Sequence, residues 1–299
     1  MRSLRSKLVE QFLFLYGGKE KFVDEKALAA FMEQKRKDRK PYVLPRKIGE
    51  RFNLVLRTYD DMSCYFFNFE NKPTKKQILY LHGGAYVSQP LIFHWNFLGK
   101  LAKETGATIY VPIYPKAPNH QYQESFDKVF LIYEEILGKS GVDNLIFMGD
   151  SAGGGFALAL AELLLEKGMP QPKHIILLSP WLDITMKNPD LRAFEKLDPL
   201  IGIYGAAEMG KSFAGNANPN YYMLSPINGE IKGLGKISVF IGTHEVLLPD
   251  IRKFKNMTEA QGVKINYFEY PNMNHVFPVY PIPEAKKARK EIVDIMENG

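Results

Sequence analysis

The centre of the chain reads Leu145-Ile146-Phe147-Met148-Gly149-Asp150-Ser151-Ala152-Gly153-Gly154. Residues 145–148 form a short apolar run typical of a buried strand, and a helix is predicted from residue 152 to about 167. The flanking glycines leave room for a sharp strand-to-helix turn that pushes a serine hydroxyl out of a sheet. This segment predicts that Ser151 is a nucleophile; taken alone, it is equally consistent with a serine that only caps the helix.

A second glycine-rich turn lies upstream, directly after an apolar run at residues 77–81. It reads His82-Gly83-Gly84-Ala85-Tyr86. Two glycines let the backbone approach a ligand and direct its N–H groups at the oxygen that becomes negative during acyl transfer. An ordinary Gly-Gly turn is the alternative, but its place after a strand and before the serine favours the functional interpretation.

Strands and helices alternate through most of the chain, which predicts an α/β protein with a mostly parallel, doubly wound sheet. The predicted strands are residues 52–56, 64–69, 77–81, 107–111, 145–148, 175–178, 237–241 and 265–270. Helices are predicted at residues 126–137, 152–167 and 284–296.

Two stretches depart from this alternation. Residues 1–45 contain two predicted helices, the first with an apolar stripe of Leu4, Leu8 and Phe12, and the second at residues 25–37. Neither helix could bury much surface alone, so we expect both to lie on the rest of the molecule as a cap. About residues 183–232 show no clear strand and indicate a helical or irregular insertion. We therefore expect a catalytic domain at residues 46–299 that carries this second cap segment.

Composition excludes several classes of protein. With 45% hydrophobic and 24% charged residues among 299, the chain is ordinary globular material. Its single cysteine, Cys64, excludes an intramolecular disulfide and a multi-thiolate metal site, and it fits a reducing compartment. The net charge of +6 is spread along the chain, which argues against a nucleic-acid partner.

No segment approaches the roughly 20 apolar residues of a membrane span. Near the N-terminus the longest apolar run, residues 12–16, is too short for a signal sequence. We therefore expect a cytoplasmic protein without stable membrane insertion. The oligomeric state stays open.

Together these motifs resemble the hormone-sensitive-lipase-like family of α/β-hydrolases, which pairs a His-Gly-Gly-Gly motif with Gly-Asp-Ser-Ala-Gly. Residues 149–153 match the second motif in full, whereas Ala85 replaces the third glycine of the first. Tyr114-Pro115-Lys116-Ala117-Pro118 and Ser179-Pro180-Trp181-Leu182-Asp183 resemble two further family segments. The resemblance spans about residues 52–296, and the N-terminal helices fit the family's cap.

The resemblance also implies roles for site residues. In this fold the triad order is serine, then Asp or Glu, then histidine. Of the histidines that follow Ser151, His174 precedes a predicted strand and His244 lies beside the candidate acid. His275 follows a predicted strand in a loop, as the family's catalytic histidine does. Glu245 occupies the position of the family's acid, and Asp250 is the alternative, with capping of the following helix as its structural interpretation.

The implied oxyanion donors are the N–H groups of Gly84, Ala85 and Ala152, with Gly83 giving the turn its freedom. His82 is expected to hold this loop through a side-chain hydrogen bond, and Asp150 to be a structural anchor. Ala85 should keep its N–H group but narrow the acyl site.

The sequence thus predicts a serine carboxylesterase that acts on small esters of short to medium acyl length through an acyl-enzyme, without a metal or organic cofactor. An amidase such as an arylformamidase-like enzyme would use the same triad. A non-catalytic small-molecule-binding protein on the same fold is the alternative of another class.

Overall fold

The computed structural model describes residues 2–67 and 74–298. Its centre is an eight-stranded sheet in the order β1-β2-β4-β3-β5-β6-β7-β8. The strands are β1 (Val55–Tyr59), β2 (Met62–Phe67), β3 (Gln77–Leu81), β4 (Thr108–Pro112), β5 (Leu145–Asp150), β6 (His174–Leu178), β7 (Lys236–His244) and β8 (Ile265–Asn274). Strand β2 runs antiparallel to β1 and to β4, and every other pair in the sheet is parallel. The predicted mostly parallel sheet is confirmed.

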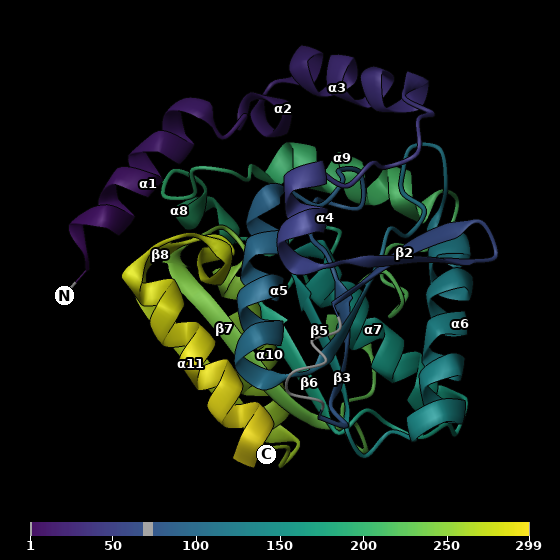
Figure 1. The fold of residues 1–299 in the computed structure, drawn as a ribbon. Helices are drawn as coiled ribbons and strands as arrows, with labels where there is room; N and C mark the ends of the chain where they lie inside the picture. The colour runs from purple at the N-terminus through teal and green to yellow at the C-terminus, as the bar shows by residue number, and fades with distance from the viewer. Residues whose placement is uncertain (1, 68–73, 299) are drawn as a thin grey trace.

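Helices cover both faces of this sheet (Figure 1). They are α1 (Leu4–Tyr16), α2 (Glu20–Val23), α3 (Glu25–Lys37), α4 (Arg46–Phe52), α5 (Ile92–Thr105), α6 (Tyr122–Ser140), α7 (Ala152–Glu166), α8 (Leu191–Glu195), α9 (Ile203–Ala214), α10 (Leu248–Ala260) and α11 (Pro283–Asn298). Two short 3-10 helices lie at Pro226–Asn228 and Phe277–Val279. Among the described residues, no helix is long and apolar enough to cross a membrane.

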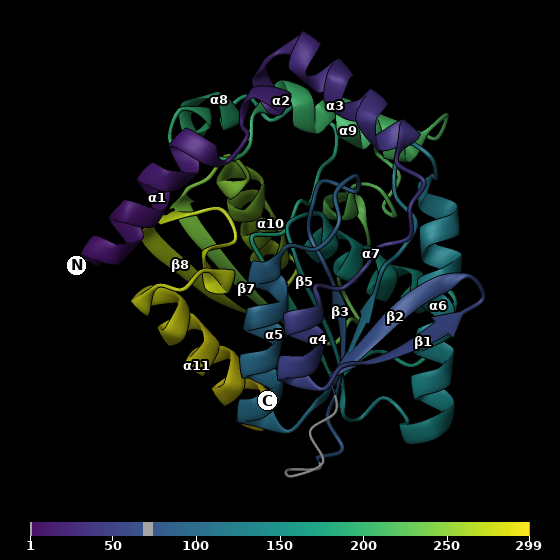
Figure 2. The same ribbon diagram turned by 45° about the horizontal axis from the view of Figure 1, so that its top comes forward.

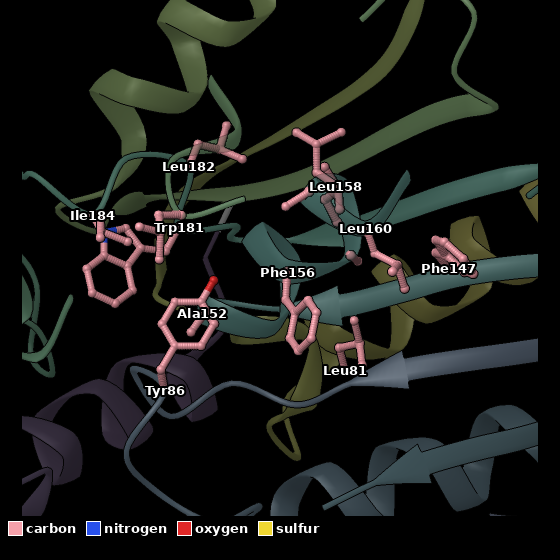
Figure 3. Close-up of a cluster of buried hydrophobic side chains, with 14 of the residues drawn as sticks. Leu81, Tyr86, Phe147, Ala152, Phe156, Leu158, Leu160, Trp181, Leu182 and Ile184 are labelled. Carbon is pink, nitrogen blue, oxygen red and sulfur yellow. The ribbon is translucent and has the colours of Figure 1, made fainter. Parts of the chain in front are cut away.

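Strand β3 shows how the sheet separates two hydrophobic cores. Leu79 and Leu81 belong to the core that α6, α7 and α10 help to form, whereas Ile78 and Tyr80 belong to the core that α4, α5 and α11 help to form. Neighbouring residues of a strand point to opposite faces, so a strand buried on both faces reads as an unbroken apolar run. Figure 3 shows part of the first core, where Phe156 of α7 lies beside Leu81.

Two strand predictions near residue 55 need correction. Residues 52–56 were expected to be a strand, but α4 runs to Phe52 and β1 begins only at Val55. Asn53 ends the helix in a left-handed conformation, with φ 48° and its N–H group bonded to the Gly49 carbonyl. The strand expected at residues 64–69 begins earlier, at Met62, and residues 68 and 69 lie outside the described part of the chain. Helices α2, α4 and α5 had not been predicted.

The two cap segments lie on the same side of the molecule (Figures 1 and 2). The two predicted N-terminal helices appear as α1 and α3, and residues 183–232 form α8, α9 and a 3-10 helix without a strand. The apolar stripe of α1, however, does not pack against the rest of the protein as expected. Leu4 is 72% exposed and Leu8 is 57% exposed, because the helix turns another face inward.

Candidate active site

Ser151 occupies the turn between β5 and α7, as the sequence predicts. Its backbone has φ 52° and ψ −124°, a conformation that L-residues rarely adopt. The turn is held open because the Ser151 N–H group donates to the Leu178 carbonyl at 2.9 Å, while the Ser151 carbonyl accepts from Trp181 N at 2.9 Å. Strand β6 and the segment after it thus fix a strained turn, which is the arrangement typical of an exposed nucleophile.

The turn also needs a residue without a side chain at position 153. A Cβ atom on Gly153 would lie 2.0 Å from the carbonyl oxygen of Leu81, the last residue of β3. The first turn of α7 therefore touches the end of β3 backbone to backbone. Because His82 follows Leu81, this contact brings the second glycine-rich turn next to the serine.

That second turn is anchored by the carboxylate of Asp150. The Gly83 N–H group donates to Asp150 Oδ1 at 2.9 Å, and a Cβ atom on Gly83 would lie 2.3 Å from Oδ2. Gly83 therefore shapes the turn, and its own N–H group is taken by the carboxylate. Gly84 and Ala85 follow with φ 125° and 53°, in the left-handed region.

The predicted roles of His82 and Asp150 match these contacts. Nδ1 of His82 lies 2.7 Å from the Gly83 carbonyl oxygen. The His82 ring stacks on the Tyr114 ring, with 4.5 Å between the ring centroids. Burial lowers the pKa of His82 well below its ordinary value, so the ring stays neutral. It holds the loop without carrying a charge.

Asp150 is fully buried and has two further partners that the sequence did not point to. Tyr80 donates to Oδ1 at 2.6 Å, and Nε2 of His94, in the first turn of α5, lies 3.1 Å from Oδ2. Burial alone would raise the pKa of Asp150, but the charge of His94 and these hydrogen bonds hold it below its ordinary value. A buried carboxylate is stable when it is paired and hydrogen-bonded in this way.

On the other side of the serine, Glu245 and His275 form a second buried pair. Glu245 Oε2 lies 2.8 Å from Nδ1 of His275. The other oxygen of Glu245 accepts from Gly242 N at 2.7 Å and from the Ser179 hydroxyl at 2.8 Å. Burial would lower the pKa of His275, but the hydrogen bond and the charge of Glu245 raise it overall. Both carboxylate oxygens of Glu245 therefore have partners that fix their orientation.

Asp250, the alternative acid, lies elsewhere. It sits in the first turn of α10, where its Oδ1 accepts from Asn188 at 2.8 Å, and burial raises its pKa to about 6. The helix begins after Leu247 and has no side-chain cap, so Asp250 does not cap it either. The structure brings Glu245, and not Asp250, to His275.

Two residues that support this second pair were missed as site residues. Besides donating to Glu245, the Ser179 hydroxyl accepts from Val276 N at 3.0 Å, next to His275. Asp198, in the cap insertion, accepts from Val246 N at 2.9 Å. Ser179 opens the segment that resembles the family, but nothing in that segment says which group its hydroxyl contacts.

A cavity of about 320 Å³ joins these elements. Ser151, His275 and the turn at residues 83–85 line its floor. Its upper wall is mainly apolar and comes from the cap: Phe12, Leu13, Tyr16, Phe22, Leu200, Ile201 and Met209. Ala152 is fully buried beside it, and its N–H group, as the first of α7, has no partner within the helix. Within residues 2–67 and 74–298, no cluster of three His, Cys, Asp or Glu side chains could hold a metal ion.

Known proteins share this sequence pattern and fold. A family profile of the alpha/beta hydrolase fold matches residues 78–279. An esterase of Acinetobacter venetianus is 32% identical over 222 residues, which cover 73% of each chain. The solved structure of a candidate esterase from Staphylococcus aureus superposes with a TM-score of 0.90 at 32% identity, covering 95% of this chain and 97% of that one.

A hormone-sensitive lipase from a metagenome library has a similar structure, with a TM-score of 0.81 at 25% identity and 98% coverage of both chains. The extent of these matches agrees with the resemblance inferred from the two glycine-rich motifs. The chain therefore belongs to the α/β-hydrolase family, and it is a carboxylic ester hydrolase of the hormone-sensitive-lipase-like kind.

Proposed function

We propose that Ser151, His275 and Glu245 are the catalytic triad of this esterase. One observation carries the proposal: His275 lines the same cavity as Ser151 and is bound through Nδ1 to a fully buried carboxylate at 2.8 Å. A histidine held in this way has its second nitrogen, Nε2, left for the serine hydroxyl. This is the relation between acid, base and nucleophile in serine hydrolases.

In the proposed reaction the Ser151 oxygen attacks the ester carbonyl while Nε2 of His275 takes its proton. The N–H groups of Gly84, Ala85 and Ala152 stabilise the negative oxygen of the tetrahedral intermediate. His275 then returns the proton to the departing alcohol, which leaves an acyl-enzyme. A water molecule, deprotonated by His275, attacks the acyl-enzyme and releases the acid and free Ser151.

The proposed substrates are esters of short to medium acyl chains. The cavity of about 320 Å³ lies at the lower end of the roughly 300–1,000 Å³ typical of small-molecule sites. Its cap wall is apolar, with Leu13, Phe22 and Met209 among the lining residues. We also propose a cytoplasmic location, since the single thiol, Cys64, is buried in the core and fits a reducing compartment; cell fractionation with an antibody would test it.

The test is hydrolysis of p-nitrophenyl esters from acetate to decanoate by the wild type and by Ser151→Ala. We expect the wild type to prefer chains of up to about eight carbons and Ser151→Ala to lose nearly all activity, by at least roughly 10³-fold. Equal rates for the two proteins would end the proposal. Matched ester and anilide substrates separate an esterase from an amidase, and a fluorophosphonate probe that fails to label Ser151 would favour a binding protein.

A further inference from the structure

Helix α1 carries a row of exposed apolar residues on the side that faces away from the protein. Leu4, Leu8, Phe12 and Leu15, which we call the α1 stripe, recur at the spacing of one helix face. They are 72%, 57%, 55% and 73% exposed, in that order. In both views of the fold α1 lies at the periphery, and no element of the described chain covers its outer side (Figures 1 and 2). A surface helix ordinarily places these residue types against the core.

The inner side of α1 is firmly attached, because it buries Leu13, packs Val9 against a hydrophobic core and makes polar contacts. Ser3 donates to Glu284 of α11 through its N–H group at 2.6 Å and through its hydroxyl at 2.9 Å. Glu10 pairs with Arg2 at 2.8 Å and with Nδ1 of His244 at 2.8 Å. The outward direction of the stripe is therefore fixed by specific contacts.

Charge on the outer side of α1 has one sign. Arg5 and Lys7 are exposed beside the stripe, whereas Glu10, the acidic residue of this helix, faces inward in its ion pairs. A helix with exposed Leu and Phe flanked by cations is typical of proteins that lie on anionic lipid surfaces, where the apolar side enters the headgroup region.

The stripe also adjoins the opening of the active-site cavity. Phe12 belongs to both, and Tyr16, one turn further along α1, lines the cavity and is 72% exposed. Leu91 also lines the cavity and is 57% exposed. A surface that met the stripe would meet the cavity as well.

We propose that the α1 stripe docks this esterase peripherally on an anionic lipid surface, so that lipid-dissolved esters enter the cavity directly. The entry of lipid-dissolved esters as substrates rests on the proposed function, whereas the docking of α1 does not. A second copy of the chain fits the stripe less well. In a parallel two-fold contact through α1, Arg5 and Lys7 would lie near their own copies. A partner seated on Phe12 would also lie against the cavity that Phe12 lines.

The test is co-sedimentation with phosphatidylglycerol and phosphatidylcholine vesicles, in wild type and in Ser151→Ala, which removes the proposed nucleophile. We expect binding to phosphatidylglycerol that weakens with added salt. Leu8→Gln with Leu15→Gln should lower vesicle affinity by at least roughly tenfold, because two apolar side chains no longer enter the lipid. Arg5→Gln with Lys7→Gln should lower affinity for phosphatidylglycerol by roughly 20-fold.

Matched controls lie away from α1. Leu56→Gln with Leu131→Gln removes two exposed leucines on β1 and α6, and Lys232→Gln with Lys264→Gln removes the same charge. Both should bind as the wild type does. The proposal is overturned if wild type does not bind phosphatidylglycerol, if the α1 variants bind as the controls do, or if light scattering shows a dimer that Leu8→Gln with Leu15→Gln dissociates.

Hydrolysis of water-soluble p-nitrophenyl acetate, measured on the same proteins, separates this proposal from the proposed function. Leu8 and Leu15 do not line the cavity, so their variants should keep wild-type turnover of this ester. If Ser151→Ala kept its activity while vesicle binding followed α1, the proposed triad would fail and the docking surface would stand.

Discussion

Ser151 lies between two histidine–carboxylate pairs, for which we propose different roles. His94 and Asp150 lie on the side of the oxyanion turn, and His275 and Glu245 lie on the other. Both histidines line the cavity and both carboxylates are buried, so burial does not distinguish the pairs. The pairs differ in what the second ring nitrogen of the histidine contacts.

In His94 the nitrogen that is not bound to Asp150, Nδ1, lies 2.9 Å from Leu91 N and 3.3 Å from the Leu91 carbonyl oxygen. Nδ1 therefore has a backbone partner with or without a proton, and both ring nitrogens are engaged. In His275 the carboxylate takes Nδ1, which leaves Nε2 for a reacting group. A histidine–carboxylate pair is therefore identified as structural or reactive by what its second nitrogen contacts.

The largest expected effect comes from removing each histidine. His275→Gln should lower kcat by roughly 10⁴-fold, because the base that accepts the serine proton is lost. His94→Gln keeps an N–H donor for Asp150 and should lower kcat by less than about tenfold. Steady-state kinetics with p-nitrophenyl butyrate measure both, and similar losses would show that the two pairs do not differ in this way.

The next largest effect is expected when the acidic residues are replaced. Glu245→Gln should lower kcat by roughly 10³-fold or more, since a neutral amide no longer stabilises the positive imidazole that forms during the reaction. Asp250→Asn serves as the matched control and should stay within about threefold of the wild type, since Asp250 contacts Asn188 and not His275. A larger loss in Asp250→Asn than in Glu245→Gln would assign the acid to Asp250.

The pair of His94 and Asp150 should also contribute to stability. His94→Gln should lower the free energy of unfolding by about 1–3 kcal/mol, because it removes a charged partner of a buried carboxylate. The pKa of Asp150 is lowered, so its contribution is present above the ordinary value of 3.8 and is lost as pH falls through the folded value. The pKa of His94 is raised, so its contribution is present below 6.5 and is lost as pH rises through the folded value.

The difference between His94→Gln and wild type should therefore be greatest between pH 3.8 and 6.5. Urea unfolding at a series of pH values measures it. A difference that grew steadily above pH 7 would contradict the ion pair.

A smaller effect is expected in the pH profile. The reaction needs neutral His275, whose pKa Glu245 raises above 6.5. The acid limb of kcat/KM should therefore have its midpoint above pH 6.5 in the wild type and move to lower pH in Glu245→Gln. Hydrolysis rates of one soluble ester between pH 5 and 9 give the midpoints of both proteins. The same midpoint in Glu245→Gln would show that the acid limb does not report on the pair of His275 and Glu245.

The smallest effect is expected at Ala85, in the turn that Asp150 anchors. Ala85→Gly relieves a φ of 53° but makes the unfolded chain more flexible, so the free energy of unfolding should change by less than about 1 kcal/mol. Removing one methyl group from the cavity wall should favour longer acyl chains by no more than about tenfold in kcat/KM. Thermal unfolding and the acyl-chain series test this; a preference for shorter chains would contradict it.

The fold and the residues of the proposed reactive pair could be predicted from the sequence, because short recognisable segments mark them. Apolar runs between turns located the parallel strands, and the two glycine-rich motifs located Ser151 and the turn at residues 83–85. The resemblance to the family, together with the triad order along the chain, pointed to Glu245 and His275. The contact between them at 2.8 Å agrees with that order.

The structural pair could not be predicted in the same way. His94 lies in α5, a helix that was not recognised, and its contact with Asp150 joins residues far apart in the sequence. The periodicity of α1 gave the helix but not the direction of its apolar side, because that direction is set by distant partners such as Glu284 and His244. A periodic apolar pattern shows which residues share a helix face, but it does not show what that face packs against.

The contact of Gly153 with the Leu81 carbonyl also determines how this protein can vary. The position of the serine relative to the oxyanion turn is set main chain against main chain, so exchanging core side chains elsewhere leaves that spacing unchanged. The cap contacts the cavity mainly through side chains, such as Leu13, Phe22 and Met209, and each of these can be replaced singly. The reacting centre and the choice of substrate are therefore separable traits, one held constant by the backbone and the other open to gradual change.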